Sequence, residues 1–246
     1  MSAHGETIAH VPVSAGTGAA LSKSLGATHS DRALPRREAA KERRRQQILE
    51  AARALIEESG ETGLSMRSLA ERARVSTATP YNLFGSKHGV LTALLDADLR
   101  RYQRRLKRSD GDTLDLVFNA ISVAREFFER EPEFYRAVLG AVYVAGADYR
   151  TLFGEPRRAF WRWLVERAIA EDIISRRIRA PDFAANLVMI FFCSIMEWVS
   201  GAISLIEMEM RVDYGIALSL LAIAQPQYRE RLESRLYEAQ GRLEAL

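Results

Sequence analysis

The segment LSMRSLAERARVSTATPYNLFGSKHGVL, residues 64–91, decides the fold, because its pattern predicts two short helices joined by a tight turn and a third helix after them. Apolar residues recur at the i, i+3, i+4 and i+7 positions that form one face of a helix. They are Met66, Leu69, Ala70 and Ala73. Ser65 precedes this face and predicts an N-cap, because its hydroxyl can accept a hydrogen bond from an unpaired amide of the first turn. We therefore expect the first helix to begin directly after Ser65.

The second helix of this segment is predicted to begin at Ser76-Thr77, where hydroxyl side chains can cap it, and to end at Phe84. Pro80 lies in its first turn, where a missing backbone donor costs least. Gly85-Ser86 indicates the end of this helix and the cap of the next one. The helix offers hydroxyls and an amide rather than large apolar groups. These polar residues are Thr77, Thr79, Tyr81 and Asn82. Hydroxyls suit phosphates and an amide suits adenine, so the pattern predicts a helix that lies in a DNA major groove.

The order and spacing of residues 45–91 closely resemble the tetracycline-repressor (TetR) family of bacterial transcription regulators. The matching residues are Arg45-Gln46-Gln47-Ile48-Leu49-Glu50-Ala51-Ala52, Leu55, Gly60, Leu64-Ser65, Leu69-Ala70-Glu71-Arg72-Ala73, Val75-Ser76, Tyr81, Phe84, Ser86-Lys87 and Leu91. The family usually has Gly where this chain has Arg74, and a non-Gly residue in a left-handed turn costs roughly 1–2 kcal/mol. Pro80 and Leu83 also replace the family's more usual residues. These departures concern the preferred operator sequence rather than the fold.

The resemblance implies an all-α protein with an N-terminal three-helix helix-turn-helix DNA-binding domain and a C-terminal helical domain for ligand binding and dimerisation. Ser109-Asp110-Gly111-Asp112 breaks the helical pattern and marks the expected boundary. We expect a disordered tail over residues 1–35, the DNA-binding domain with its linking helix over 36–108, and the effector-binding and dimerisation domain over 109–246. The resemblance also implies that the last two family helices of each protomer build a four-helix dimer interface.

The charge of the chain is distributed unevenly. The 246 residues carry a formal net charge of +3, and 48% of them are hydrophobic, which is enough for one large core or two modest ones. Residues 31–112 hold 18 Lys/Arg and 12 Asp/Glu, a net charge of +6, whereas residues 113–246 have a net charge of −3. Many solvated helices reach an excess of this size. It nevertheless falls in the half with the helix-turn-helix pattern, and the two together indicate a polyanionic partner.

The cysteine content and the first residues predict the compartment. Residues 1–30 are rich in Ala, Gly, Ser and Thr, and we expect no secretory signal there, because no apolar segment follows a basic start. Cys193 is the only cysteine, so an internal disulfide is impossible and the reducing cytoplasm of a bacterium fits. Its neighbours Phe191 and Phe192 predict a buried, unreactive thiol.

Beyond residue 112 the apolar residues follow helical spacing, and no alternation of period two persists. Helices are expected over residues 114–130, 133–145, 156–174, 181–207, 212–224 and 226–246. Residues 187–206 are apolar on all sides apart from Glu197 and small hydroxyl residues, and twenty such residues could span a bilayer. An acidic residue near the centre costs about 2.5–3.5 kcal/mol on insertion, and the flanking Asp182, Glu207 and Glu209 supply no positive-inside bias. We therefore expect this helix to be buried between an internal cavity and a twin subunit rather than in a membrane.

Further DNA contacts are expected from the three helices around the recognition helix. The complete candidate set is Arg43, Arg44, Arg45, Ser65, Arg67, Thr77, Thr79, Tyr81, Asn82 and Lys87. The three arginines can contact phosphates, although a solvated helix start is the alternative. The resemblance implies that Tyr81 and Lys87 bind phosphates while Thr77 and Asn82 face base edges. For Tyr81 the alternative is packing into the small core.

Aromatic and methionine side chains of the C-terminal half are candidates for lining an adaptable apolar effector pocket. The candidates are Phe128, Tyr143, Phe160, Trp163, Met189, Phe192, Met196 and Glu197. Aromatic and methionine residues at helical spacing are more often part of the ordinary hydrophobic core. Glu197 differs, because a carboxylate among apolar neighbours needs a partner. It pairs with an arginine of its own subunit, with one across the dimer, or with a cationic or hydroxylated ligand.

The sequence contains no pattern of catalytic residues. His88 stands apart from the three histidines of the first thirty residues, and no metal-ligand spacing, nucleophile elbow or phosphate-binding loop is present, so we expect no metal or cofactor. The favoured function is a homodimeric, sequence-specific transcription regulator, a repressor released from a palindromic DNA operator by a small-molecule effector. The alternatives are a DNA-organising protein without an effector, a membrane-tethered helical sensor and, last, a helical enzyme.

Overall fold

The computed structural model describes residues 36–60, 63–108, 111–144 and 155–246, without the side chains of residues 36, 37, 143 and 144. Residues 1–40 and 41–246 form two separate units. The start of the first helix is the only described part of the first unit, and the tail expected over residues 1–35 lies outside the described residues.

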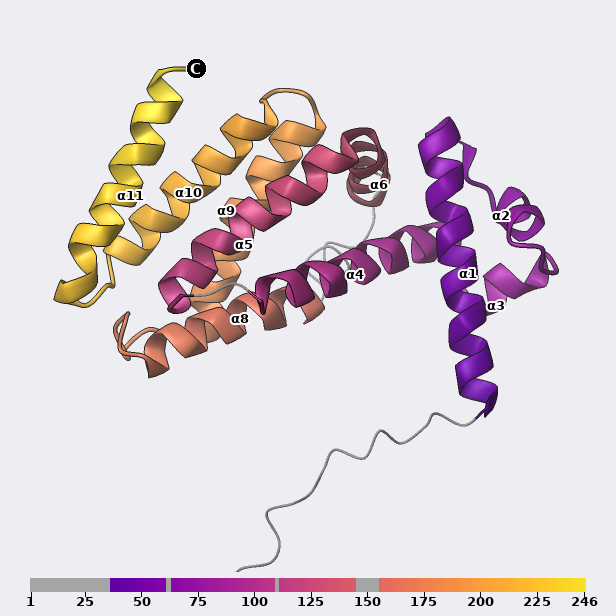
Figure 1. Ribbon diagram of the computed structural model, residues 1–246, viewed down its shortest axis with the longest axis horizontal. Helices are drawn as coiled ribbons and strands as arrows, with labels where there is room; N and C mark the ends of the chain where they lie inside the picture. The colour runs from indigo at the N-terminus through magenta and orange to yellow at the C-terminus, as the bar shows by residue number, and fades with distance from the viewer. Residues whose placement is uncertain (1–35, 61–62, 109–110, 145–154) are drawn as a thin grey trace, which may run out of the picture. The chain divides into compact units, whose positions relative to one another are not determined.

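Ten α-helices account for the regular structure of the described residues, which confirms the predicted all-α fold (Figure 1). In chain order they are α1 (Arg36–Ser59), α2 (Met66–Arg72), α3 (Ala78–Phe84), α4 (Lys87–Leu106), α5 (Thr113–Arg130), α6 (Pro132–Val144), α8 (Glu155–Ala170), α9 (Ala180–Val199), α10 (Leu205–Leu221) and α11 (Pro226–Glu244). An isolated antiparallel bridge joins Ile174 to Ala224. Helix α5 packs against α4, α6, α8 and α10, and α10 also packs against α9 and α11.

The helix-turn-helix forms as the sequence predicts, except that no side-chain hydrogen bond from Thr77 caps α3. Ser65 caps α2 by accepting a hydrogen bond from the amide of Ser68, and the Ser68 hydroxyl in turn accepts from the amide of Ser65. The predicted apolar face of α2 is buried. The turn after α2 places Arg74 at φ 52, so the left-handed conformation expected at the family's glycine position is adopted by an arginine. Gly85, at φ 75, ends α3, and Ser86 caps α4 by accepting from the amide of Gly89.

Several expected helix boundaries in the C-terminal half were wrong. The long helix over residues 181–207 is interrupted, because α9 ends at Val199 and α10 begins at Leu205. Gly201 adopts φ 79 after the end of α9, its amide donates to the Trp198 carbonyl, and the amide of Ala202 donates to the Glu197 carbonyl. This is the hydrogen-bond pattern of a Schellman motif, and it closes the helix.

The other wrong boundaries concern the neighbouring helices. Ser204 caps α10, which spans residues 205–221. This helix therefore begins earlier than residue 212, where the sequence predicted its start. Helix α8 ends at Ala170 rather than at Ile174, because Asp172 adopts φ 54 and turns the chain. Ile173 and Ile174 are nevertheless buried, as their apolar character requires.

Helix α9 has a buried face and an exposed face. Leu187, Ile195 and Trp198 are buried, whereas Met189 and Cys193 are exposed. The prediction of a buried thiol at Cys193 was therefore wrong for the single chain: the four-residue step from Met189 to Cys193 keeps both side chains on the same outer face. Among the described residues, α9 is the one helix long and apolar enough to cross a membrane by length and composition, and it instead packs against α8 and α10.

Candidate nucleic-acid interface and effector cavity

The recognition helix α3 presents most of its predicted polar side chains to solvent. Tyr81 is 52% exposed, so it does not pack into the small core, and Thr77 and Asn82 are exposed as well. Thr79 is half-buried, and its hydroxyl lies 2.8 Å from that of Ser76 across the first turn. Pro80 is the buried residue of this helix. The helix therefore packs by its proline side and leaves hydroxyls and an amide accessible.

Helix α2 supports α3 and exposes two of the candidates at its start. Ser65 is exposed while it caps the helix. Arg67 forms an ion pair with Glu71 one turn later, 3.0 Å between Nε and Oε1, and both side chains are well exposed. An exposed pair of this kind contributes about 0–1 kcal/mol. Arg67 can therefore leave Glu71 for a phosphate at little cost.

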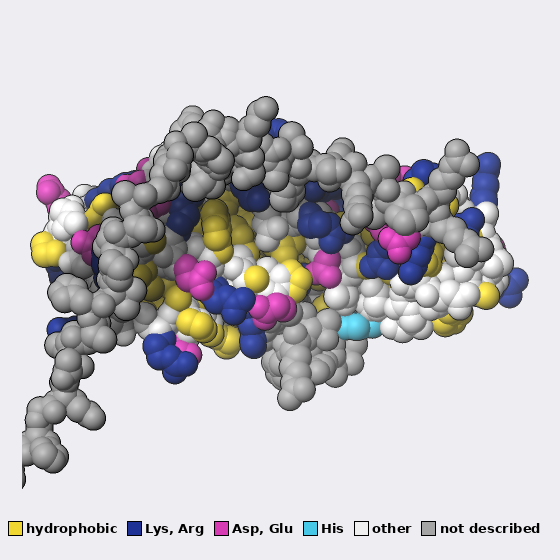
Figure 2. Space-filling model, turned by 90° about the horizontal axis from the view of Figure 1, so that it is seen from below, with side chains coloured by type: hydrophobic (Ala, Val, Ile, Leu, Met, Phe, Trp, Pro, Cys, Tyr) yellow, Lys and Arg dark blue, Asp and Glu magenta, His cyan; other side chains and the backbone are white. Residues whose placement is uncertain are grey.

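The three arginines of α1 do not share one environment. Arg43 and Arg44 are exposed. Arg45 is half-buried, donates from Nη1 to the carbonyl of Leu83 at 3.1 Å, and places its guanidinium 4.4 Å from the ring centroid of Phe84. The guanidinium of Arg45 thus fixes the end of α3, a role that the sequence analysis did not foresee. Lys87 is the first residue of α4 and half-buried. Figure 2 shows Lys and Arg side chains in dark blue at several places on the face seen there.

A cavity of about 140 Å³ lies between α4, α5, α6, α8 and α9. Its walls are mainly aromatic and aliphatic. The lining residues are Leu95, Asp98, Leu99, Tyr102, Ala124, Phe127, Phe128, Tyr135, Leu139, Arg157, Phe160, Trp161, Val188, Phe191, Phe192 and Ile195. The Tyr102 hydroxyl donates to the Ala120 carbonyl at 2.9 Å, and burial raises the pKa of this phenol far above its usual range. The cavity is therefore apolar and contains a few polar groups that already have partners.

The predicted effector residues divide into those that line this cavity and those that lie elsewhere. Phe128, Phe160 and Phe192 line it. Trp163 instead borders a second hollow of about 630 Å³, whose walls also include Lys107 and Arg167.

The remaining predicted effector residues whose side chains are described lie away from the walls of the first cavity. Met189 is exposed on α9, and Met196 is half-buried against the core. The side chain of Tyr143 lies outside the described residues. Glu197 is half-exposed and pairs with Arg211 of α10 at 3.0 Å, the first of the three partners considered for it.

Sequence reasoning missed the polar residues of the cavity wall, namely Asp98, Tyr102, Tyr135 and Arg157. A signal existed for Asp98 alone, which falls between Leu95 and Leu99 on an otherwise apolar helix face. Among the described residues, no group of three or more His, Cys, Asp or Glu side chains is arranged to hold a metal ion.

Comparisons with known proteins agree with this architecture. Residues 48–94 match the family described as "Bacterial regulatory proteins, tetR family". The helix-turn-helix transcriptional regulator YdeS of Bacillus subtilis (strain 168) is 32% identical over 149 residues, which cover 58% of this chain and 72% of the relative. The helix-turn-helix transcriptional repressor KstR of Rhodococcus jostii (strain RHA1) is 27% identical over 190 residues, which cover 74% of this chain and 84% of the relative.

A solved structure shares the fold. A TetR transcriptional regulator from Rhodococcus sp. RHA1 superimposes with a TM-score of 0.60 at 24% sequence identity, covering 73% of this chain and 97% of that protein. The helix-turn-helix, the family match and the identity to YdeS together define the class: the chain belongs to the TetR family of DNA-binding transcription regulators.

Proposed function

We propose that this protein is a cytoplasmic, homodimeric repressor that binds a palindromic DNA operator and is released from it by a small-molecule effector. The observation that carries the proposal is the exposed polar face of α3, made of Thr77, Tyr81 and Asn82 on a helix held from behind by α2 and Arg45. A short polar helix fixed in this way suits insertion into a major groove, where base edges present donors and acceptors.

Within this interface the proposed roles follow from side-chain chemistry. Asn82 can bond an adenine edge in two places, and Thr77 can reach a neighbouring base. Tyr81 and Lys87 contact phosphates on either side of the groove, together with Arg43. Base contacts give sequence preference, whereas phosphate contacts give affinity that falls with salt.

The dimer is proposed on the exposed apolar side chains of α9 and α10. Met189 and Cys193 lie on α9, and Ile206 and Leu218, each about half-exposed, lie on α10. A second copy of the same two helices would cover these side chains. A two-fold pair would present two α3 helices to half-sites one helical turn apart, roughly 34–36 Å.

The effector is proposed to occupy the cavity lined by Phe128, Phe160 and Phe192, because a mainly apolar hollow with few polar groups is typical of small-molecule sites. The repressor role rests on the relative KstR, which is named a transcriptional repressor. A ligand in the cavity would change the spacing of the two α3 helices and thereby lower operator affinity.

The test compares three variants on a duplex selected from genomic fragments of the source bacterium. Asn82→Ala should cost about 1–3 kcal/mol at one base position and relax sequence preference there, whereas Lys87→Ala should weaken binding to all sequences alike. Arg176→Ala serves as the matched control, because it removes an exposed cation from the segment between α8 and α9. Equal losses from Asn82→Ala and Lys87→Ala on every operator variant would contradict the assigned roles.

A further inference from the structure

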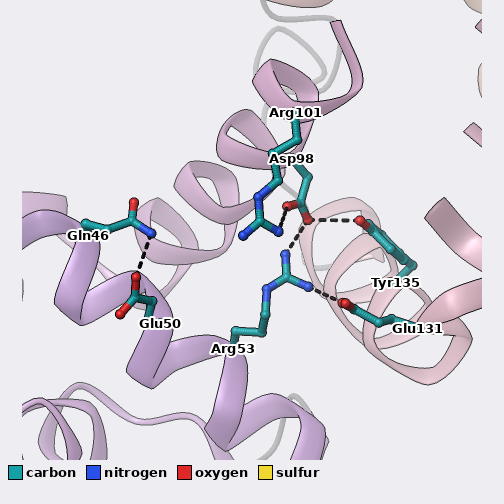
Figure 3. Close-up of polar contacts among 7 residues, drawn as sticks. All are labelled: Gln46, Glu50, Arg53, Asp98, Arg101, Glu131 and Tyr135. Carbon is teal, nitrogen blue, oxygen red and sulfur yellow. Dashed lines mark hydrogen bonds and ion pairs between the residues drawn. The ribbon is translucent and has the colours of Figure 1, made fainter. Parts of the chain in front are cut away.

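A cluster of charged side chains joins α1 to the helices around the cavity (Figure 3). Arg53 of α1 donates to Oδ2 of Asp98 on α4 at 2.5 Å and also bonds the carboxylate of Glu131, which follows α5. The side chain of Arg53 is 17% exposed and that of Asp98 is 7% exposed. The guanidinium lies 4.0 Å from the ring centroid of Phe134 on α6. Four elements thus meet at one buried ion pair.

Asp98 belongs to this cluster and to the cavity wall at the same time. It lines the cavity together with Tyr135, whose hydroxyl donates to Oδ2 of Asp98 at 3.0 Å. The other carboxylate oxygen, Oδ1, accepts a long contact of 3.4 Å from Arg101. A carboxylate offers about four acceptor positions. Oδ1 therefore retains capacity for a hydrogen-bond donor that enters from the cavity.

Both partners of the ion pair between α1 and α4 are largely removed from water. Burial lowers the pKa of Arg53, but the charges of Asp98 and Glu131 outweigh burial and raise it above its ordinary value. Burial, and after it the charge of Asp98, raises the pKa of Tyr135, so its hydroxyl stays a donor at neutral pH. When a buried ion pair loses one partner, the other charge is left uncompensated. A group that takes Asp98 from Arg53 therefore weakens the contact between α4 and α1.

We propose that Asp98 senses the effector and transmits its presence to α1 through Arg53, and that the effector is a small apolar molecule with one hydroxyl or amine donor and no carboxylate. This inference rests on the proposed function. A hydroxyl or amine of the effector competes with Arg53 and Tyr135 for hydrogen bonds to the Asp98 carboxylate. A ligand carboxylate would instead place a second negative charge beside Asp98 in a mainly apolar site, where the cation of the wall, Arg157, is already paired with Asp96 at 3.4 Å. The cavity volume suits a molecule near the size of benzene, which binds an apolar cavity of about 150 Å³ in another protein.

The coupling is tested on the full-length protein with the neutral variants Asp98→Asn and Arg53→Gln and their combination. Each single variant should lower operator affinity about tenfold, and the double variant should also lose about tenfold rather than a hundredfold, because the two residues act through one contact. Asp182→Asn is the matched control, since its partner Arg179 and its own side chain are exposed at the start of α9. Additive losses, or wild-type affinity in both single variants, would overturn the coupling.

Thermal unfolding separates this role from a merely structural one. A structural role lowers the unfolding midpoint of each variant and leaves operator affinity, measured well below that midpoint, unchanged. Tyr135→Phe keeps the Arg53–Asp98 pair and removes one competing donor from Asp98. This variant should bind the operator like the wild type and release it at several-fold lower concentrations of a donor ligand.

The ligand class is tested with three probes of one ring size: benzyl alcohol, toluene and benzoate. Saturation-transfer NMR measures whether each probe binds, and fluorescence anisotropy measures operator affinity in its presence. Benzyl alcohol and toluene should both bind, benzyl alcohol alone should weaken the wild-type operator complex, and Asp98→Asn should abolish this response. Binding of benzoate with equal effect, or binding of none of the three, would overturn the assigned class. A wild-type protein that binds no duplex would instead refute the proposed function.

Discussion

The position of Arg45 permits a prediction that separates support of the recognition helix from DNA contact. Arg45→Ala removes a hydrogen bond to the Leu83 carbonyl and a guanidinium that lies over the ring of Phe84. A hydrogen bond from a charged donor is worth about 1.5–3 kcal/mol and a partly exposed cation–π contact about 0.5–1 kcal/mol. Because the site is only half-buried, we expect a loss of about 2 kcal/mol in the free energy of unfolding.

The assay measures urea unfolding and the salt dependence of operator binding for Arg45→Ala beside Arg43→Ala. Arg43 is exposed two residues earlier on the same helix and provides the matched loss of charge. Arg43→Ala should leave stability unchanged and reduce the slope of log affinity against log salt by about 0.9, the value of one phosphate contact. Arg45→Ala should lose stability and keep the slope. The opposite result for Arg45, unchanged stability with a reduced slope, would refute the assigned support of α3.

Two further predictions concern α10 and its neighbours. Burial raises the pKa of Asp213 to about 6 despite its contact with Arg235. The pKa of Asp213 in the folded state lies above its ordinary value of 3.8. The protonated group therefore stabilises the fold fully below pH 3.8, and this stabilisation is lost as the pH rises through about 6. Asp213→Asn should therefore remove a stability decline of up to about 3 kcal/mol between pH 4 and pH 7, and an unchanged pH profile would contradict this. Gly215→Ala should destabilise the fold by about 1 kcal/mol, because the new Cβ would lie 2.9 Å from Ile190 Cγ2. Gly241→Ala has open space around it and should stabilise the fold by about 1 kcal/mol. Equal shifts of the two variants in a thermal melt would refute the close approach of α9 and α10.

The helix-turn-helix was predictable because its determinants are local. Capping by Ser65 and the stop at Gly85 depend on residues within one or two turns, and the left-handed turn at Arg74 follows from the family's spacing. Apolar periodicity likewise gave the existence of the remaining helices. The break after Val199 was missed because an uninterrupted apolar run outweighed the Gly201 signal.

The polar wall of the cavity could not be predicted from the sequence. Arg53, Asp98 and Tyr135 are separated by 45 and 37 positions, and no local pattern relates them. Their contact exists only once α1, α4 and α6 are packed. The exposed face of α9 was not predicted from the sequence for a related reason. The side of an apolar helix that faces solvent depends on which neighbours cover it, and Cys193 lies on the uncovered side.

The most direct test of the account is hydroxyl-radical footprinting of the wild-type protein on a duplex selected from genomic fragments. Two protected patches are expected on one face of the duplex, one helical turn apart, related by sequence symmetry and formed by two chains per site. Protection should disappear when a donor-bearing ligand fills the cavity. A single patch bound by one chain, or protection that covers unrelated sequences equally, would contradict the central claim that two copies of α3 recognise a palindromic operator.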